Sequence, residues 1–265
     1  MMNPAEFANI AAAERDLWWY RGMRRILFRM LRRTTRGRKF QRVLEAGCGT
    51  GFFAAVLQRE WRVPVTAVDL SAEGLRYARG MHLGRLAQSN LAALPFRDAA
   101  FDAVLSLDVI VHFPRGEESQ PMKELSRVLE PSGLLVIRVS ALDALRSRHS
   151  EFVMERQRFT RRRLMDLAQS CGIRVLRCSY ANSLLMPVAL AKFRFWEPLR
   201  RQPAASGVGA GPAWLDRILY RTLAFEASCL AAGLNFFLGQ SLILIGEKSA
   251  QAAAGPLCAV NMKAV

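Results

Sequence analysis

Cysteine is scarce in this sequence, and the cysteines present are not arranged as a site. There are five, an odd number, and no two have the C-x-x-C spacing of a redox or zinc motif. The sequence therefore predicts no disulfide framework and no metal site, and it fits a reducing compartment. The N-terminal residues also lack the apolar run of a signal peptide, because Glu6, Glu14 and Asp16 interrupt them. We therefore expect a cytoplasmic location.

Acidic residues are also few relative to basic ones. Lys and Arg total 38 against 22 Asp and Glu, which gives a formal charge of +16. Such a charge favours anionic partners, among them nucleic acid, anionic lipid and phosphorylated substrates. Arginine supplies nearly all of it, and an arginine bias can also reflect genome composition, so the charge alone selects no partner. The length of 265 residues suits one α/β domain with a sizeable core, or a domain with an insertion.

The most informative stretch joins an expected buried strand at Val43–Ala46 to an expected helix that includes Ala54–Leu57. Three glycines lie between them at alternate positions, Gly47-x-Gly49-x-Gly51. Glycine lets a ligand approach the backbone closely, and the free N–H groups of a helix's first turn point at that ligand. The stretch therefore predicts a nucleotide-type site. A dinucleotide fingerprint needs G-x-G-x-x-G, so the spacing disfavours a nicotinamide-dependent reductase.

Glu45 lies two positions before the first glycine, and the combination resembles motif I of the class I S-adenosylmethionine-dependent methyltransferases, [D/E]-x-G-x-G-x-G. A glycine-rich turn alone can join any strand to any helix. Four later segments, however, resemble the same family in the same order: 63–71, 88–96, 101–112 and 124–139. The resemblance implies an α/β fold, a doubly wound Rossmann-like sheet of seven mostly parallel strands in the order 3-2-1-4-5-7-6, with the last strand antiparallel.

The resemblance also implies which residues bind the cofactor, S-adenosylmethionine. Glu45 is expected near the methionyl amino group and Asp69, at the end of the second strand, on the ribose. Ser71 is the better helix cap, which leaves Asp69 for the ligand. Asn90 replaces the family's usual aspartate at the adenine, where its carbonyl oxygen can still accept a hydrogen bond. The predicted cofactor-binding residues are Trp19, Glu45, Ala46, Gly47, Cys48, Gly49, Gly51, Asp69, Leu70, Asn90, Leu91 and Asp108.

Two histidines are candidates for a catalytic role toward the methyl acceptor. His112 follows the fourth expected strand and could act as a general base, although a structural histidine that holds the loop is the preferred interpretation. His149 lies in a segment similar to W-S-x-H-D of one bacterial branch of the family, with Arg146 and Ser150 departing from that pattern. A structural role for His149 is an equal alternative.

The regions outside the core suggest how the site is covered. Trp18–Arg21 resembles the W-W-[FY]-R segment of the same bacterial branch, in which N-terminal helices help to cover the cofactor. The basic amphipathic stretch 5–33 could lie on a membrane, but packing on its own domain is preferred. The apolar run that ends at 241–248 is interrupted by Glu226 and is needed as a strand, so it is not a membrane span. The predicted divisions are an N-terminal cap at 1–39, the core at 40–180, a helical insertion at 181–240, the last strand at 241–248 and a disordered tail at 249–265.

The sequence thus predicts a methyltransferase that transfers a methyl group directly to a small hydrophobic or lipid-linked acceptor, with peripheral contact to an anionic membrane as a hypothesis. A nucleic-acid methyltransferase is the alternative enzyme, disfavoured because no N-P-P-Y-type segment and no appended RNA-binding module are present. A non-catalytic protein that binds the cofactor or a membrane partner is the alternative from another class. Neither the acceptor nor the oligomeric state can be read from the sequence.

Overall fold

The computed structural model describes residues 2–200, 203, 205–209 and 211–250. From residue 251 on, the predicted tail lies outside the described residues. The helices are α1 (Glu6–Ala13), α2 (Trp18–Thr35), α3 (Phe52–Trp61), α4 (Ala72–Arg79), η1 (Ile110–His112), α5 (Ser119–Val128), η2 (Asp143–Leu145), α6 (Arg148–Phe152), α7 (Arg161–Ser170), α8 (Met186–Ala191), the π-helix η3 (Lys192–Trp196), α9 (Glu197–Arg200) and α10 (Ala213–Ala231). The strands are β1 (Val43–Ala46), β2 (Val65–Asp69), β3 (Arg85–Gln88), β4 (Phe101–Leu107), β5 (Leu129–Ser140), β6 (Ile173–Ala181) and β7 (Ser241–Lys248).

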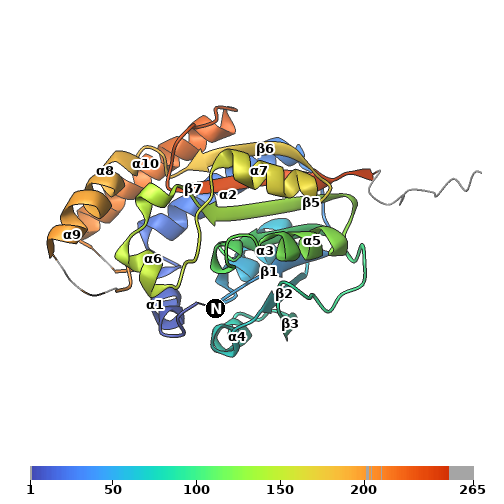
Figure 1. Ribbon diagram of the computed structural model, residues 1–265. Coiled ribbons are helices and arrows are strands. Elements are labelled where there is room, and N and C mark those ends of the chain that lie inside the picture. Colours follow the sequence, from blue (N-terminus) through green and yellow to red (C-terminus); the bar gives the residue numbers. More distant parts are fainter. Residues whose placement is uncertain (1, 201–202, 204, 210, 251–265) are drawn as a thin grey trace, which may run out of the picture.

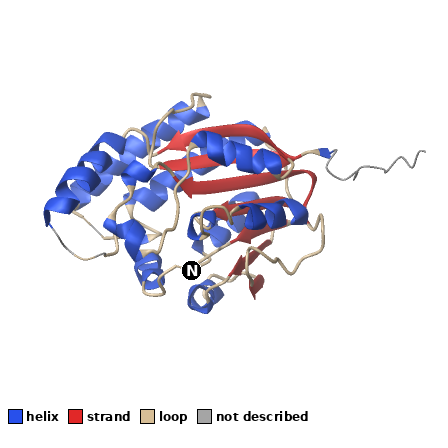
Figure 2. Cartoon of the chain, in the orientation of Figure 1, coloured by secondary structure: helices blue, strands red, loops and turns tan. Residues whose placement is uncertain are grey.

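The seven strands form one sheet in the order β3-β2-β1-β4-β5-β7-β6 (Figures 1 and 2). All neighbours are parallel except β7, which runs antiparallel to both β5 and β6. The predicted fold class and strand order are therefore confirmed. The chain reverses its direction of travel across the sheet between β1 and β4. In open α/β sheets the crevice at the carboxyl ends of such strands is where ligands bind.

Alternate side chains of each central strand enter two different cores, one on each face of the sheet. On β7, Leu242 and Leu244 face one core, which α5 and α7 cover. Ile243 and Ile245 face the other, which α2, α3 and α10 cover. Since all four side chains are fully buried, the strand reads as a continuous apolar run rather than an alternating one.

Helix α2 packs lengthwise against α10, far away in the sequence. The apolar stripe that includes Met23, Ile26 and Met30 is fully buried there, while Arg25 and Arg29, between these residues, are exposed. At Gly22 an added Cβ would lie 2.3 Å from the Leu223 side chain, so glycine permits the close approach of the two helices. The amphipathic stretch therefore packs on its own protein, as the preferred interpretation of the sequence held.

The sequence analysis did not locate one strand, and it predicted the end of one helical region wrongly. The pattern gave no indication of where β3 lies, because this strand is a short edge strand with mostly exposed side chains. The helical insertion was predicted to extend to residue 240, but α10 ends at Ala231 and an irregular segment leads to β7. Within the part of the chain that the structure describes, no helix is both long and apolar enough to cross a membrane.

Candidate cofactor and acceptor pocket

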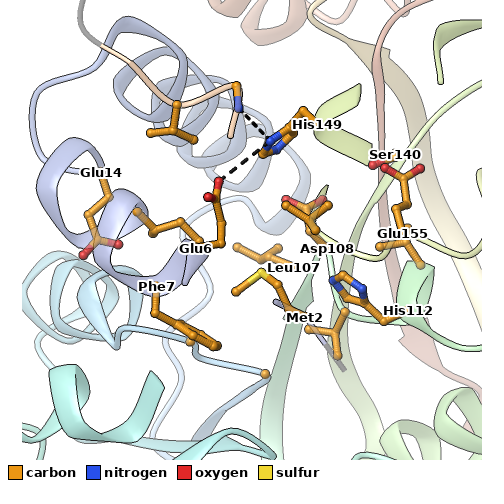
Figure 3. Close-up of a pocket in the computed structure, with 18 of the residues that line it drawn as sticks. Met2, Glu6, Phe7, Glu14, Leu107, Asp108, His112, Ser140, His149 and Glu155 are labelled. Carbon is orange, nitrogen blue, oxygen red and sulfur yellow. Dashed lines mark hydrogen bonds and ion pairs between the residues drawn. The ribbon is translucent and has the colours of Figure 1, made fainter. Parts of the chain in front are cut away.

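A cavity of about 860 Å³ lies over the carboxyl ends of β1, β2 and β4. Its walls come from the glycine loop between β1 and α3, the N-terminal helices, the segment after β5 and the insertion (Figure 3). Pockets for small organic ligands commonly measure about 300–1,000 Å³. This cavity is therefore large enough for a nucleotide-sized ligand together with a second small molecule.

At position 47 the loop requires glycine for two reasons. Its φ of 89° is in the left-handed region, and an added Cβ would lie 2.1 Å from Cγ2 of Val109. The backbone N–H groups of Gly47 and Cys48 both donate to the carbonyl of Val68, at 2.7 and 2.9 Å. These contacts hold the turn against the end of β2, and they leave the loop's surface open to the cavity.

Glu45 is the most unusual group in the cavity wall. Its side chain is 2 % exposed, and its Oε2 has no hydrogen-bond partner. Burial raises the pKa of the Glu45 carboxyl well above its ordinary value, although the Arg138 guanidinium lowers it. A buried acceptor without a partner is costly unless a ligand supplies the donor. The position therefore suits a cationic or N–H-rich group of a bound molecule.

Asp69 is less free than the sequence suggested. Its Oδ2 accepts from the Gly49 N–H at 2.7 Å and its Oδ1 from the Ser71 N–H at 2.8 Å. Ser71 caps α4, as predicted, by accepting from the Gly74 N–H. Because an ionised carboxylate has about four acceptor sites, two remain for a ligand that enters the cavity. Burial raises the pKa of Asp69.

Asn90 uses its carbonyl oxygen within its own turn, where Oδ1 accepts from the Ala92 N–H at 2.9 Å. The sequence interpretation gave this oxygen to a ligand. The turn takes one of its lone pairs, and the side-chain N–H₂ group is left as the donor.

Most of the predicted cofactor residues line this cavity, but two do not. Ala46 is fully buried, and its carbonyl accepts from the Ser106 hydroxyl. Gly51 precedes α3 and packs against Ala78 of α4. The predicted residues that line the cavity are Trp19, Glu45, Gly47, Cys48, Gly49, Asp69, Leu70, Asn90, Leu91 and Asp108, together with His112 and His149.

Asp108 is held by Arg138, whose Nε and Nη2 lie 2.9 and 2.6 Å from the same carboxylate oxygen. The guanidinium also lies over the Trp19 ring, 5.3 Å from its centroid. Arg138 thus links the end of β4 to the first turn of α2 at the cavity wall. Sequence reasoning missed Arg138 because it lies within an apolar strand pattern and carries no motif.

His112 is anchored by a hydrogen bond between its Nδ1 and the Met154 carbonyl, 3.3 Å away. A carbonyl only accepts, so Nδ1 carries the proton and Nε2 keeps its lone pair. Burial lowers the pKa of His112, which keeps the ring neutral near pH 7. The contact agrees with the loop-holding role, and it leaves one nitrogen available to a ligand.

His149 has the opposite proton arrangement. Its Nδ1 accepts from the backbone N–H of Gly207 at 3.0 Å, so the neutral ring carries its proton on Nε2. Oε1 of Glu6, a fully buried residue, lies 3.8 Å from the same Nδ1 and accepts from the Ser206 hydroxyl (Figure 3). Burial lowers the pKa of His149, while Glu6 raises it. These contacts join α1, α6 and the insertion at one end of the cavity.

Glu14 and Tyr20 of the N-terminal segment also line the cavity, and the sequence reasoning did not assign them to the site. Glu14 is buried, its Oε2 accepts from the Thr50 hydroxyl at 2.6 Å, and its Oε1 has no partner. Burial raises its pKa to about 7. Burial also raises the pKa of the Tyr20 phenol. The only sequence signal was the occurrence of acids in an otherwise basic segment.

This combination of fold and site defines a class. A doubly wound sheet with an antiparallel seventh strand carries an acidic glycine loop at its switch point, with a second acid at the end of the next strand. The buried, unpartnered Glu45 and the glycine cradle fit a ligand with a cationic end and a nucleoside end. These are features of S-adenosylmethionine-binding enzymes, as the motif resemblance implied.

Comparison with known proteins supports the same class. Residues 44–137 match the family described as "Methyltransferase domain". The chain is 36 % identical over 128 residues to a malonyl-[acyl-carrier protein] O-methyltransferase of Erwinia billingiae, covering 47 % of this chain and 49 % of that protein. It is 38 % identical over 97 residues to a fatty-acid O-methyltransferase of Mycolicibacterium smegmatis (35 % of each). It is 36 % identical over 110 residues to a probable tRNA methyltransferase 9B of Bos taurus (41 % of this chain, 23 % of that protein).

The chain thus contains, at residues 44–137, a region that matches the methyltransferase domain family. The chain spans about half the length of the first of these relatives and less of the others. The similarity therefore identifies the domain and its cofactor, and the three relatives act on acceptors of different kinds.

Proposed function

We propose that this protein transfers the methyl group of S-adenosylmethionine to a small hydrophobic or lipid-linked acceptor in the 860 Å³ cavity. The observation that carries the proposal is Glu45, a buried carboxylate whose Oε2 lacks a partner beneath the glycine loop. When bound, S-adenosylmethionine supplies a methyl group that its sulfonium makes electrophilic without acid catalysis. The protein then has to bind the cofactor, align the acceptor atom with the methyl group and exclude water.

The cofactor end of the cavity has a donor or acceptor for each polar part of such a ligand. We assign Glu45 to the cationic amino group, since a charge-assisted hydrogen bond would satisfy its free oxygen. The two remaining acceptor sites of Asp69 suit a pair of ribose hydroxyls. Asn90 would donate its N–H₂ to a base nitrogen, in place of the acceptor role expected from the sequence. The ring of Trp19 and the glycine loop complete the enclosure.

The acceptor end lies under the insertion, which brings aromatic side chains to the wall beside charged ones. Phe193 and Trp196 of η3 line it, together with the segment 205–209. Two of the relatives described above are named for acyl or fatty-acid acceptors. The aromatic side chains of η3 suit the apolar part of an acceptor of that class, and burial beneath the cap would exclude water from the transfer.

We assign the two histidines different roles toward the acceptor, one as a hydrogen-bond donor and one as a base. His149 carries its proton on Nε2 and would donate a hydrogen bond to the acceptor, which orients it. His112 has the free Nε2 lone pair and would be the base where the acceptor atom has a proton to lose. An acceptor that is already a carboxylate needs no base at all.

Calorimetric titration with S-adenosylmethionine and with S-adenosylhomocysteine tests the cofactor assignment. We expect micromolar binding of both. Transfer of radioactive methyl groups to fatty acids, acyl thioesters and membrane lipid extracts then tests the acceptor class. Cofactor binding without transfer to any of them, but with transfer to RNA, would overturn the acceptor proposal. Failure of a folded sample to bind either ligand would favour the non-catalytic alternative.

Nucleic acid remains the second candidate acceptor, because of the charge of +16 and the probable tRNA methyltransferase among the relatives. A structured RNA would need an open, basic approach to the methyl group. Here the aromatic side chains Phe193 and Trp196 of η3 line the acceptor end instead. We therefore expect total transfer RNA to be a poor methyl acceptor in the same assay.

A further inference from the structure

The insertion exposes an unusual amount of apolar surface. Phe195 and Leu199, from η3 and α9, are 70 % and 80 % exposed. Trp214 and Phe225 of α10 are 62 % and 63 % exposed, and Ile218 lies between them. Figure 1 shows α8, α9 and α10 together at the end of the molecule away from β3. Clusters of this kind on soluble surfaces mark binding faces.

The exposed residues of α10 lie on one side of that helix. Trp214, Ile218, Arg221 and Phe225 are spaced by four, three and four positions, which places them on one helical face. The opposite face, with Leu223 and others, is buried against α2. The helix is therefore apolar on both sides, and only one of the sides has a partner within the described chain.

Basic side chains flank this apolar surface. Arg217 and Arg221 lie on the exposed face of α10, and Lys192 and Arg194 lie on η3. Among the described residues, no carboxylate forms an ion pair with Arg194, Arg217 or Arg221. Aromatic and aliphatic side chains interleaved with arginine are typical of a surface that enters the interface of an anionic bilayer.

The π-helix η3 carries an exposed side chain and also forms part of the cavity wall. In η3, Phe193 and Trp196 line the cavity, while Phe195, between them in sequence, is exposed on the outside. Lys192 and Glu197 line it as well. A membrane bound to the outer side of η3 would therefore lie next to the acceptor end of the cavity.

We propose that the exposed apolar side chains of the insertion, Phe195 and Leu199 on η3 and α9 together with Trp214, Ile218 and Phe225 on α10, dock the protein on an anionic lipid bilayer, from which the acceptor enters the cavity beside η3. The inference rests on the proposed function where it assigns a lipid acceptor, but the docking itself does not require catalysis. The apolar content favours a bilayer over a polyanion, which would be bound by charge alone.

Co-sedimentation with vesicles tests the proposal. The protein should bind vesicles containing phosphatidylglycerol and should bind pure phosphatidylcholine vesicles at least tenfold more weakly. The double substitution Phe195→Ser with Leu199→Ser should lower binding to the anionic vesicles at least tenfold. Arg217→Ser with Arg221→Ser should lower it about 30-fold, from the usual contribution of a basic residue near an anionic surface. Arg79→Ser, on α4 at the opposite edge of the sheet, is the matched control and should bind nearly as the wild type does.

Three results would overturn the proposal. The first is equal binding to neutral and anionic vesicles that the apolar substitutions leave unchanged. The second is binding to RNA or heparin without binding to vesicles. The third is a dimer in light scattering that Phe195→Ser with Leu199→Ser converts to monomers. The last result would assign the face to a second copy of the chain. Calorimetric cofactor binding by the same variants separates the two proposals, since these exposed residues should leave it unchanged.

Discussion

Replacing Glu45 with glutamine separates the effect of this buried carboxyl group on stability from its effect on cofactor binding. The free protein keeps this carboxylate under the glycine loop with Oε2 unpartnered, and burial raises its pKa. The change to an amide removes the cost of burying an ionisable group with almost no change of shape. We therefore expect the free variant to unfold at a higher temperature than the wild type. For a chain of this size about 1 kcal/mol corresponds to roughly 2–4 °C.

The same substitution should weaken cofactor binding. A hydrogen bond to a charged partner contributes about 1.5–3 kcal/mol, so the dissociation constant should rise roughly 10- to 150-fold. Differential scanning calorimetry and isothermal titration on the same samples measure both effects. Glu60→Gln, the same chemical change at an exposed position, is the control and should alter neither. A Glu45→Gln variant that melts lower, or that binds the cofactor as tightly as the wild type, would contradict the assignment.

Three further predictions concern the same cavity. Asp69→Ala removes the acceptor of the Gly49 N–H as well as the proposed ribose contact, and should abolish measurable cofactor binding in calorimetry; retained tight binding would refute the assignment. Gly47→Ala puts a Cβ against Val109 at a positive φ and should cost about 1–3 kcal/mol in urea unfolding, whereas an unchanged midpoint would show that the loop relaxes. Glu14 has its pKa raised from 4.5 to about 7, so its ionisation costs stability as the pH rises through that window. Glu14→Gln should therefore lose less thermal stability between pH 5 and pH 8 than the wild type, and an identical pH profile would contradict the burial argument.

The sequence predicted the sheet well because its signals are local. The strand before Gly47 and the positions of Glu45 and Asp69 follow from short segments with strong chemical constraints. The edge strand β3 escaped notice because an exposed strand of four residues has no buried pattern to detect. Its place in the sheet is set by pairing with β2, which is a property of the folded state.

The site was predicted less completely than the sheet, and for a related reason. Glu14 meets Thr50 across 36 positions of sequence, and Glu6 meets His149 only after α1 has packed over the loop. Such pairs carry no spacing rule that a sequence could reveal. For Asn90 the sequence predicted the position correctly but not the hydrogen bonding, because its carbonyl oxygen accepts from the Ala92 N–H within a local turn.

The packing of α2 on α10 has a consequence for the order in which the protein can fold. The first backbone N–H of α2, at Trp18, donates to the carboxylate of Asp216, 198 positions further along the chain. During synthesis α2 therefore leaves the ribosome long before its partner exists, with its apolar stripe uncovered. The strand β7, which separates β5 from β6, is made later still. The cofactor cavity, walled by the N-terminal helices and by the insertion, is consequently among the last parts of the nascent chain to become complete.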